Sequence, residues 1–269
     1  MLTVVDPLRD ASAASIAPSA RRPGGASIAL RGVEKSFQKG VTALAPVDLF
    51  IAAGEFVSIV GPSGCGKSTL LRVIADLVPA SRGECARARD AKAAFVFQEA
   101  ALLPWRNVEG NAELLMELES HPSTERKRQA AEALRLVGLD GFETLYPHQL
   151  SGGMRMRLSL ARAIALKPDL LLLDEPLAAV DELTRDVLQD ELLRLWALIG
   201  FTAILVTHNV HEAVYLSKRV VVMSPRPGRV LKIFDIPLPD ARTPELRASP
   251  EFARLAGDIS ATLRHGVAA

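Results

Sequence analysis

The sequence is poor in the features that mark secreted and nucleic-acid-binding proteins. It holds only 2 cysteines among 269 residues, Cys65 and Cys85, which is too few for a disulfide framework, so we expect a cytosolic setting. The 32 Lys and Arg residues nearly balance the 31 Asp and Glu residues, and the formal net charge is +1. Because this balance creates no strong field for neutralising phosphates, we expect no nucleic-acid partner.

Long apolar runs are also missing. The longest uncharged run extends over residues 195–206 and is interrupted by Gly200 and Thr202, whereas a membrane-spanning helix needs about 20 apolar residues. A secretory signal is not expected either, because charged residues at positions 6, 9 and 10 interrupt any apolar region. Any function at a membrane would therefore be performed from its surface.

The most informative segment is a glycine-rich loop between an apolar, β-branched run (Phe56–Val60) and a helical run (Leu70–Ala75). The loop consists of Gly61, Pro62, Ser63, Gly64, Cys65, Gly66, Lys67, Ser68 and Thr69. Between a strand and a helix, such glycines let backbone N–H groups surround phosphate oxygens at the helix N-terminus. Lys67 would reach the β- and γ-phosphates, and Ser68 would offer its hydroxyl to Mg²⁺. A chance glycine turn is the alternative; we predict nucleotide binding.

Two carboxylates, Asp174 and Glu175, follow an apolar strand predicted over residues 169–173. They would lie near the phosphate loop if this strand and the loop-bearing strand are neighbours in a parallel sheet. Asp174 would then hold Mg²⁺, through water, and Glu175 could polarise an attacking water. A solvated acidic turn is the alternative. His208 ends another predicted buried strand, residues 201–207, where it is either structural or a γ-phosphate contact.

Three further features have a structural and a functional interpretation. Phe37 either packs in the core or offers a face on which adenine stacks. The apolar loop over residues 99–105 either folds back on the core or docks another protein. Ser151 could cap a helix whose first N–H groups are exposed by Gly152 and Gly153, which would make a second anion site.

The remaining pattern suggests how the chain is divided. Residues 1–26, rich in Ala, Ser, Pro and Arg, are predicted to be a disordered leader, with a targeting role as the alternative. Helices over 108–119 and 123–137 indicate a helical subdomain at about residues 100–160 within a domain over 27–235. A hairpin turns around residues 225–228, and residues 236–269 form a linker and a helix that packs back on the domain.

Taken together, residues 27–235 resemble the ATP-binding subunit of an ATP-binding-cassette (ABC) transporter. The motifs of this family occur here in order: Walker A at Gly61–Thr69, the Q-loop at Gln98, the signature at Leu150–Met154, Walker B at Leu170–Glu175, the D-loop at Leu177–Asp181 and the switch histidine at His208. The resemblance implies an α/β fold: a P-loop (RecA-like) core sheet, an antiparallel β subdomain and a helical ABC subdomain. Three residues depart from the usual pattern: Met156 replaces Gln, Asn209 replaces Asp, and Phe37 replaces Tyr.

The resemblance also implies roles. Phe37 and Gly61–Thr69 would bind ATP, while Ser68, Gln98 and Asp174 would hold Mg²⁺. Glu175, His208 and Gln98 would act in hydrolysis. Members of the family work as head-to-tail homodimers, in which Ser151, Gly152 and Gly153 would act on the partner's ATP and Asp181 would contact the partner.

A narrower likeness, carried by residues 97–105 and 206–229, is to ATPases of nitrate, sulfonate and taurine importers. It implies a membrane permease, a periplasmic or extracellular solute-binding protein, and a peripheral place on the cytoplasmic face of the inner (plasma) membrane. Three alternatives remain open. They are an importer for another small solute such as a pyrimidine precursor, a soluble ABC ATPase without a permease, and a P-loop kinase, which would not need Ser151-Gly152-Gly153.

Overall fold

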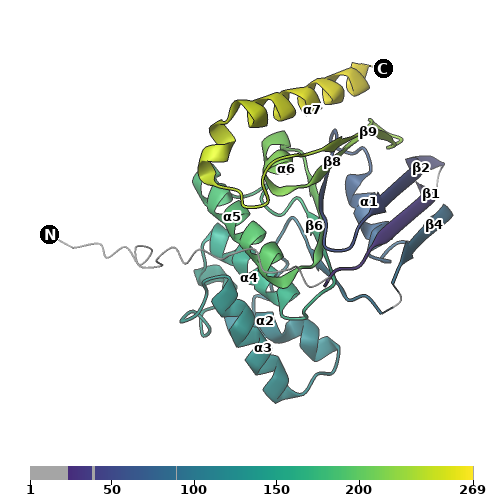
Figure 1. The fold of residues 1–269 in the computed structure, drawn as a ribbon. Coiled ribbons are helices and arrows are strands. Elements are labelled where there is room, and N and C mark those ends of the chain that lie inside the picture. The colour runs from purple at the N-terminus through teal and green to yellow at the C-terminus, as the bar shows by residue number, and fades with distance from the viewer. Residues whose placement is uncertain (1–23, 38–39, 89, 269) are drawn as a thin grey trace.

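The computed structural model describes residues 24–37, 40–88 and 90–268, which form two sheets flanked by helices (Figure 1). The larger sheet has the strand order β5-β6-β7-β3-β8-β9. Its strands are β3 (Phe56–Val60), β5 (Ala93–Val96), β6 (Leu170–Asp174), β7 (Thr202–Thr207), β8 (Arg219–Met223) and β9 (Val230–Asp235). All pair in parallel except β9, which pairs antiparallel to β8.

The smaller sheet is antiparallel, in the order β2-β1-β4. It contains β1 (Ile28–Phe37), β2 (Val41–Ile51) and β4 (Arg82–Arg87). The helices are α1 (Lys67–Ile74), α2 (Val108–Leu118), α3 (Ser123–Leu136), α4 (Gly152–Ile164), α5 (Glu182–Ile199), α6 (Val210–Leu216) and α7 (Pro250–Ala268), with short 3₁₀ turns η1 (Pro147–Gln149) and η2 (Pro244–Ala248). Helices α2 and α3 lie together at the end of the molecule away from α7 (Figure 1).

The central strands are buried on both faces because helices or the second sheet cover them. Every residue of β3, β6 and β7 is buried, which matches their continuous apolar sequences. Alternate residues of β3 enter different cores: Phe56 and Val60 pack with the helices, while Val57 and Ile59 pack with α1 and the small sheet. This alternation fixes the register of the strand that leads into the phosphate loop.

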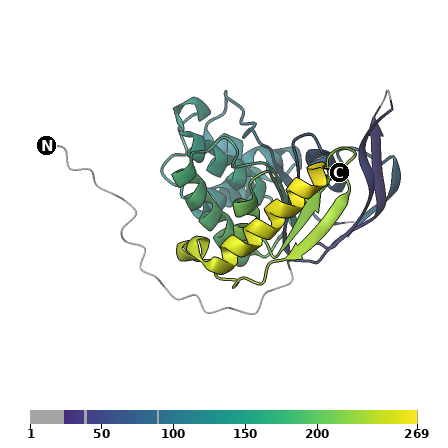
Figure 2. The same ribbon diagram turned by 90° about the horizontal axis from the view of Figure 1, so that it is seen from above.

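Several elements follow the sequence-based predictions, and the α/β fold is confirmed. The helix at the end of the chain buries Phe252, Leu255 and Ile259 and crosses the molecule beside β9, as Figure 2 shows. Residues 1–23 of the predicted leader lie outside the described residues. The division of the chain into subdomains stays a prediction. Within the described ranges, no helix combines the length and the apolar character needed to cross a membrane.

Other expectations were wrong. The segment over residues 41–51, for which no single element was predicted from the sequence, is one continuous strand, in which Pro46 is accommodated at a register shift against β1. Strand β4 was missed because its sequence, RGECAR, is largely exposed and does not alternate. The strands that carry the phosphate loop and the two carboxylates are not neighbours: β7 lies between β3 and β6.

Candidate nucleotide-binding site

The phosphate loop connects β3 to α1 and has a backbone that requires glycine. Gly66 has a φ of 110°, in the left-handed region, and is the N-terminal cap of α1. A Cβ atom at this position would lie 2.7 Å from the carbonyl oxygen of Ala43. The loop is therefore packed against β2, and its backbone path is fixed before any phosphate arrives.

Lys67 is the first residue of α1, and its side chain is only 4% exposed. Its Nζ donates to the carbonyl oxygens of Gly61 at 2.8 Å and Pro62 at 3.0 Å. The ammonium group therefore lies against the loop itself. This is the place from which it can contact the phosphates of a bound nucleotide.

Ser68, on α1, contacts Asp174, at the end of β6, although β6 is not adjacent to β3, the strand that leads into the phosphate loop. The Ser68 hydroxyl donates to Asp174 Oδ1 at 2.7 Å, and Asp174 is 7% exposed at the end of β6. A hydroxyl and a carboxylate are oxygen ligands of the kind that Mg²⁺ prefers, so this pair fits a nucleotide-bound magnesium ion. The sequence-based prediction that these two residues lie together therefore agrees with the geometry, for a different topological reason.

Glu175 and His208 form the second polar pair of the site. His208 Nδ1 lies 2.9 Å from Glu175 Oε2, and the two residues follow the neighbouring strands β6 and β7. Glu175 has a φ of 48°, which is unusual for a residue with a side chain, and its N–H donates to Val206 O at 2.9 Å. This strained turn directs the carboxylate toward the histidine and away from the strand.

Two further predicted residues lie at strand ends. Phe37 ends β1 with 45% of its surface exposed, so it is not a core residue, and the Lys35 ammonium lies 5.2 Å from its ring centroid. Gln98 is exposed and follows β5, the strand next to β6. Both side chains are accessible to a ligand, whereas their predicted contacts with ATP and Mg²⁺ stay predictions.

The predicted signature residues lie at the start of another helix, α4. Ser151 caps α4, since its hydroxyl accepts from the N–H of Met154 at 3.2 Å, and both Ser151 and Gly152 are exposed. Asp181 caps the adjacent α5; the backbone N–H of Thr184 donates to its carboxylate at 3.0 Å and lowers its pKa. Among the described residues, no hydrogen bond joins Ser151, Gly152 or Gly153 to the phosphate loop.

Comparisons with known proteins agree with this geometry. Residues 44–178 match the family described as ABC transporter. The chain is 43% identical over 240 residues to the taurine import ATP-binding protein TauB of Rhizobium johnstonii, which covers 84% of this chain and 91% of that protein. The aliphatic sulfonates import ATP-binding protein SsuB of Bacillus cereus is 40% identical over 230 residues, covering 81% of this chain and 90% of that protein. The chain belongs to the ABC transporter family.

This ABC transporter ATPase is similar in structure to a protein that hydrolyses ATP. The chain superimposes with a TM-score of 0.68 and 32% identity on a dimeric ATP-binding cassette in a post-hydrolysis state bound to ADP and Pi, covering 78% of this chain and 98% of that chain. The family and the fold predicted from the sequence are thereby confirmed. The alternative that the chain is a P-loop kinase is therefore excluded.

Two departures of this ABC ATPase from the family pattern have a structural explanation. Met156 is 7% exposed and lines an apolar pocket with Val96, Leu173 and Leu177, so its side chain packs in the core between α4, β6 and α5. Asn209 caps α6 by accepting from the N–H groups of His211 and Glu212.

Sequence reasoning missed the support of the phosphate loop by the hairpin turn. Gly228 exchanges backbone hydrogen bonds with β2, and a Cβ atom at this position would lie 2.1 Å from Cys65 O. The turn was interpreted only as a connection between β8 and β9. No local sequence signal indicates that it packs against a loop more than 150 residues earlier, since this contact arises from the pairing of β8 with β3.

Proposed function

We propose that this ABC transporter ATPase is the energising subunit of an importer for a small anionic solute of the nitrate, aliphatic sulfonate or taurine class. The names of the relatives TauB and SsuB, which are import proteins for taurine and aliphatic sulfonates, support the solute class. The observation that carries the ATPase part is the pair of contacts Ser68–Asp174 and Glu175–His208 beside one phosphate loop. An importer for a pyrimidine precursor is the alternative for the solute.

In this proposal each residue of the site has its own role in binding or hydrolysing ATP. Lys67 and the loop amides bind the β- and γ-phosphates, and Phe37 stacks on the base. Ser68, Asp174 and Gln98 would hold Mg²⁺, which would neutralise charge on the phosphates when bound. Glu175 orients and polarises the attacking water, and His208 contacts the γ-phosphate while its Nδ1 is held by Glu175.

Two copies of the chain complete each site. Ser151, Gly152 and Gly153 are at the exposed start of α4, where N–H groups and the helix dipole favour an anion. In a head-to-tail homodimer, this group lies on the ATP held by the partner's phosphate loop, and Asp181 contacts the partner. The γ-phosphate then bridges the two copies, and its loss on hydrolysis lets them separate. The dimeric relative bound to ADP and Pi supports this arrangement.

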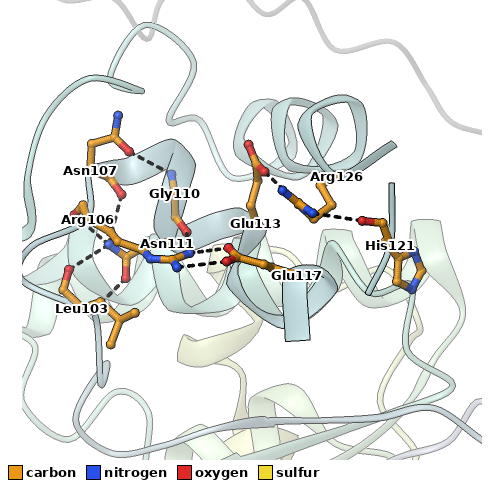
Figure 3. A network of polar contacts seen from close by, with 9 residues as sticks. All are labelled: Leu103, Arg106, Asn107, Gly110, Asn111, Glu113, Glu117, His121 and Arg126. Carbon is orange, nitrogen blue, oxygen red and sulfur yellow. Dashed lines mark hydrogen bonds and ion pairs between the residues drawn. The ribbon is translucent and has the colours of Figure 1, made fainter. Parts of the chain in front are cut away.

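The permease would dock beside α2, where a polar network shapes an exposed loop (Figure 3). The fully buried Asn111 accepts from Leu103 N at 2.8 Å and donates to the carbonyl oxygens of Leu103, Arg106 and Asn107. Arg106 also donates to both oxygens of Glu117. The loop therefore has a fixed shape and presents Trp105, which is 72% exposed. With a permease at this loop, the ATPase would be peripheral on the cytoplasmic face of the membrane.

The decisive experiment is Glu175→Gln, because the amide keeps the shape of the side chain but cannot act as a base. We expect Mg-ATP binding to persist, dimers to accumulate in Mg-ATP, and phosphate release to fall by about 100-fold or more. Size-exclusion chromatography with light scattering and a phosphate-release assay measure these outcomes. Glu132→Gln, on the exposed face of α3, is the matched control and should behave as the unmodified protein. Unchanged hydrolysis in Glu175→Gln would remove Glu175 from this role.

The solute is tested separately on the complex with the co-purified permease and binding protein. Taurine, an alkanesulfonate, nitrate and a pyrimidine precursor are added in turn, and ATP hydrolysis in proteoliposomes is measured. Stimulation by one of the first three supports the proposed class, whereas stimulation by the pyrimidine precursor alone supports the alternative. ATP hydrolysis that needs no permease and responds to no solute would favour a soluble ABC ATPase.

A further inference from the structure

The loop that carries His208 is closed by a ring of hydrogen bonds that the proposed reaction does not use. The Thr207 hydroxyl donates to the Glu212 carboxylate and accepts from the N–H of Asn209 at 3.0 Å. The Asn209 side-chain oxygen in turn accepts from the N–H of Glu212 at 3.2 Å. Because His208 lies within this ring, the ring sets the position from which the imidazole reaches Glu175.

Glu212 is the exceptional member of the ring. Its residue surface is 4% exposed, its Oε2 is bonded by Thr207, and its buried Oε1 has no hydrogen-bond partner among the described residues. Burial raises the pKa of this carboxyl, whereas the Thr207 hydrogen bond and Arg185 lower it. A buried carboxylate oxygen without a donor costs free energy, so its presence calls for a compensating group.

Arg185, on α5, is the nearby cation that acts electrostatically on Glu212. Its guanidinium donates to Val180 O at 2.8 Å and to Leu177 O at 3.4 Å. These two carbonyl groups belong to the short segment between Glu175 and Asp181. Arg185 therefore holds the segment that leads to the predicted partner contact.

A small cavity lies between these two groups. Its volume is about 20 Å³, and the residues that line it include Glu175, Arg185, Thr207, His208 and Glu212. A cavity needs about 10–15 Å³ to hold one water molecule, and the water needs two or more polar partners. Here the Glu212 carboxylate can accept from a water, and the Arg185 guanidinium can donate to it.

We propose that Glu212 and Arg185 are joined through one water molecule in this cavity, and that this link ties the loop of His208 to the segment that precedes Asp181. Glu212 is then a positioning residue for His208, since its carboxylate supports the loop and not the phosphates. The link makes the geometry of the hydrolytic groups and that of the partner contact depend on each other within one protomer. The inference rests on the proposed function, in which His208 and Asp181 act in hydrolysis and in pairing.

The test is a double-mutant cycle in the full chain with Glu212→Gln, Arg185→Gln and the combination. We expect each single variant to lower kcat about tenfold and to leave KM for ATP within about twofold, because neither residue supports the phosphate loop. The double variant should be about as slow as the slower single variant, since both changes break one link. Glu55→Gln, which breaks the partly buried ion pair with Arg219, is the matched control and should leave kcat unchanged.

Three results would overturn the link: a kcat of Glu212→Gln equal to that of the unmodified protein, losses that multiply in the double variant, or a raised KM with unchanged kcat. If Glu212→Gln does not fold, Thr207→Val and Thr207→Ser take its place, and only the valine variant should lower kcat. Failure of the link is distinguishable from failure of the proposed function. In the first case Glu175→Gln still abolishes hydrolysis, whereas in the second case it does not.

Discussion

The phosphate loop and the signature segment are both helix N-termini suited to phosphate, yet they are built in opposite ways. In the first, Lys67 is buried against its own loop and Ser68 is bonded to Asp174. In the second, Ser151 caps α4 and Gly152 is exposed. A site whose groups already hold one another can bind a ligand alone, whereas an exposed one needs another surface. In the proposed mechanism, this difference would place nucleotide affinity in the phosphate loop, and the signature would act on the nucleotide of a second copy.

The largest expected effect is on Lys67. Lys67→Ala removes the only ammonium that the phosphate loop itself carries, and charge-assisted hydrogen bonds are among the strongest in proteins. We expect the Mg-ATP affinity of the isolated chain to fall by about 100-fold, as measured by calorimetry. Lys92→Ala, which removes an exposed lysine paired with Glu119, is the control and should bind normally. An affinity within threefold of the unmodified chain would contradict the central role of the loop.

A negative charge at the signature should have the opposite effect to Lys67→Ala: it should leave ATP binding unchanged and reduce pairing and hydrolysis. Gly152→Asp has room for its side chain, since the nearest heavy atom to a Cβ lies 3.9 Å away, and an acidic residue is favourable in a first helical turn. Folding and ATP affinity of the single chain should therefore be unchanged. Pairing in Mg-ATP and hydrolysis should fall by about tenfold or more, because the carboxylate repels the partner's γ-phosphate.

Gly257→Asp is the matched control for this charge, because Gly257 lies on the exposed face of α7 with nothing within 4 Å of a Cβ. It should pair and hydrolyse as the unmodified chain does. Light scattering with Mg-ATP in a Glu175→Gln background separates pairing from turnover. Normal pairing of the Gly152→Asp chain would mean that the signature does not face a phosphate.

The same contrast should be visible in stability. Gly66→Ala places a Cβ 2.7 Å from Ala43 O at a φ of 110°, so we expect a loss of about 2 kcal/mol or more in the free energy of unfolding. Gly152→Ala has no close neighbour and no positive φ, and it should change stability by less than about 0.5 kcal/mol. Urea titrations of both variants measure the difference. Equal effects would show that the phosphate loop is not rigid.

Much of this contrast could be predicted from the sequence because it depends on local patterns. The apolar runs of β3, β6 and β7, the glycines before α1 and the capping Ser151 are each encoded within a few residues. The strand order could not be derived this way, because the insertion of β7 between β3 and β6 depends on pairings between distant segments. For the same reason the packing of Gly228 on Cys65 was not anticipated.

The smallest expected effect concerns the two thiols, and it tests how closed the phosphate loop is. Burial raises the pKa of both Cys65 and Cys85, so both are mainly protonated at neutral pH and react slowly. Cys65 is 1% exposed, whereas Cys85 is half-buried in β4. We expect iodoacetamide to modify Cys85 several-fold faster, and Mg-ATP to slow the reaction of Cys65 alone. Mass spectrometry of digests measures both rates, and the Cys85→Ser variant allows the slower reaction of Cys65 to be measured alone. If Cys65 reacted as fast as Cys85, the loop would open often enough to admit the reagent, and the proposed contrast between a preformed and an incomplete site would be lost.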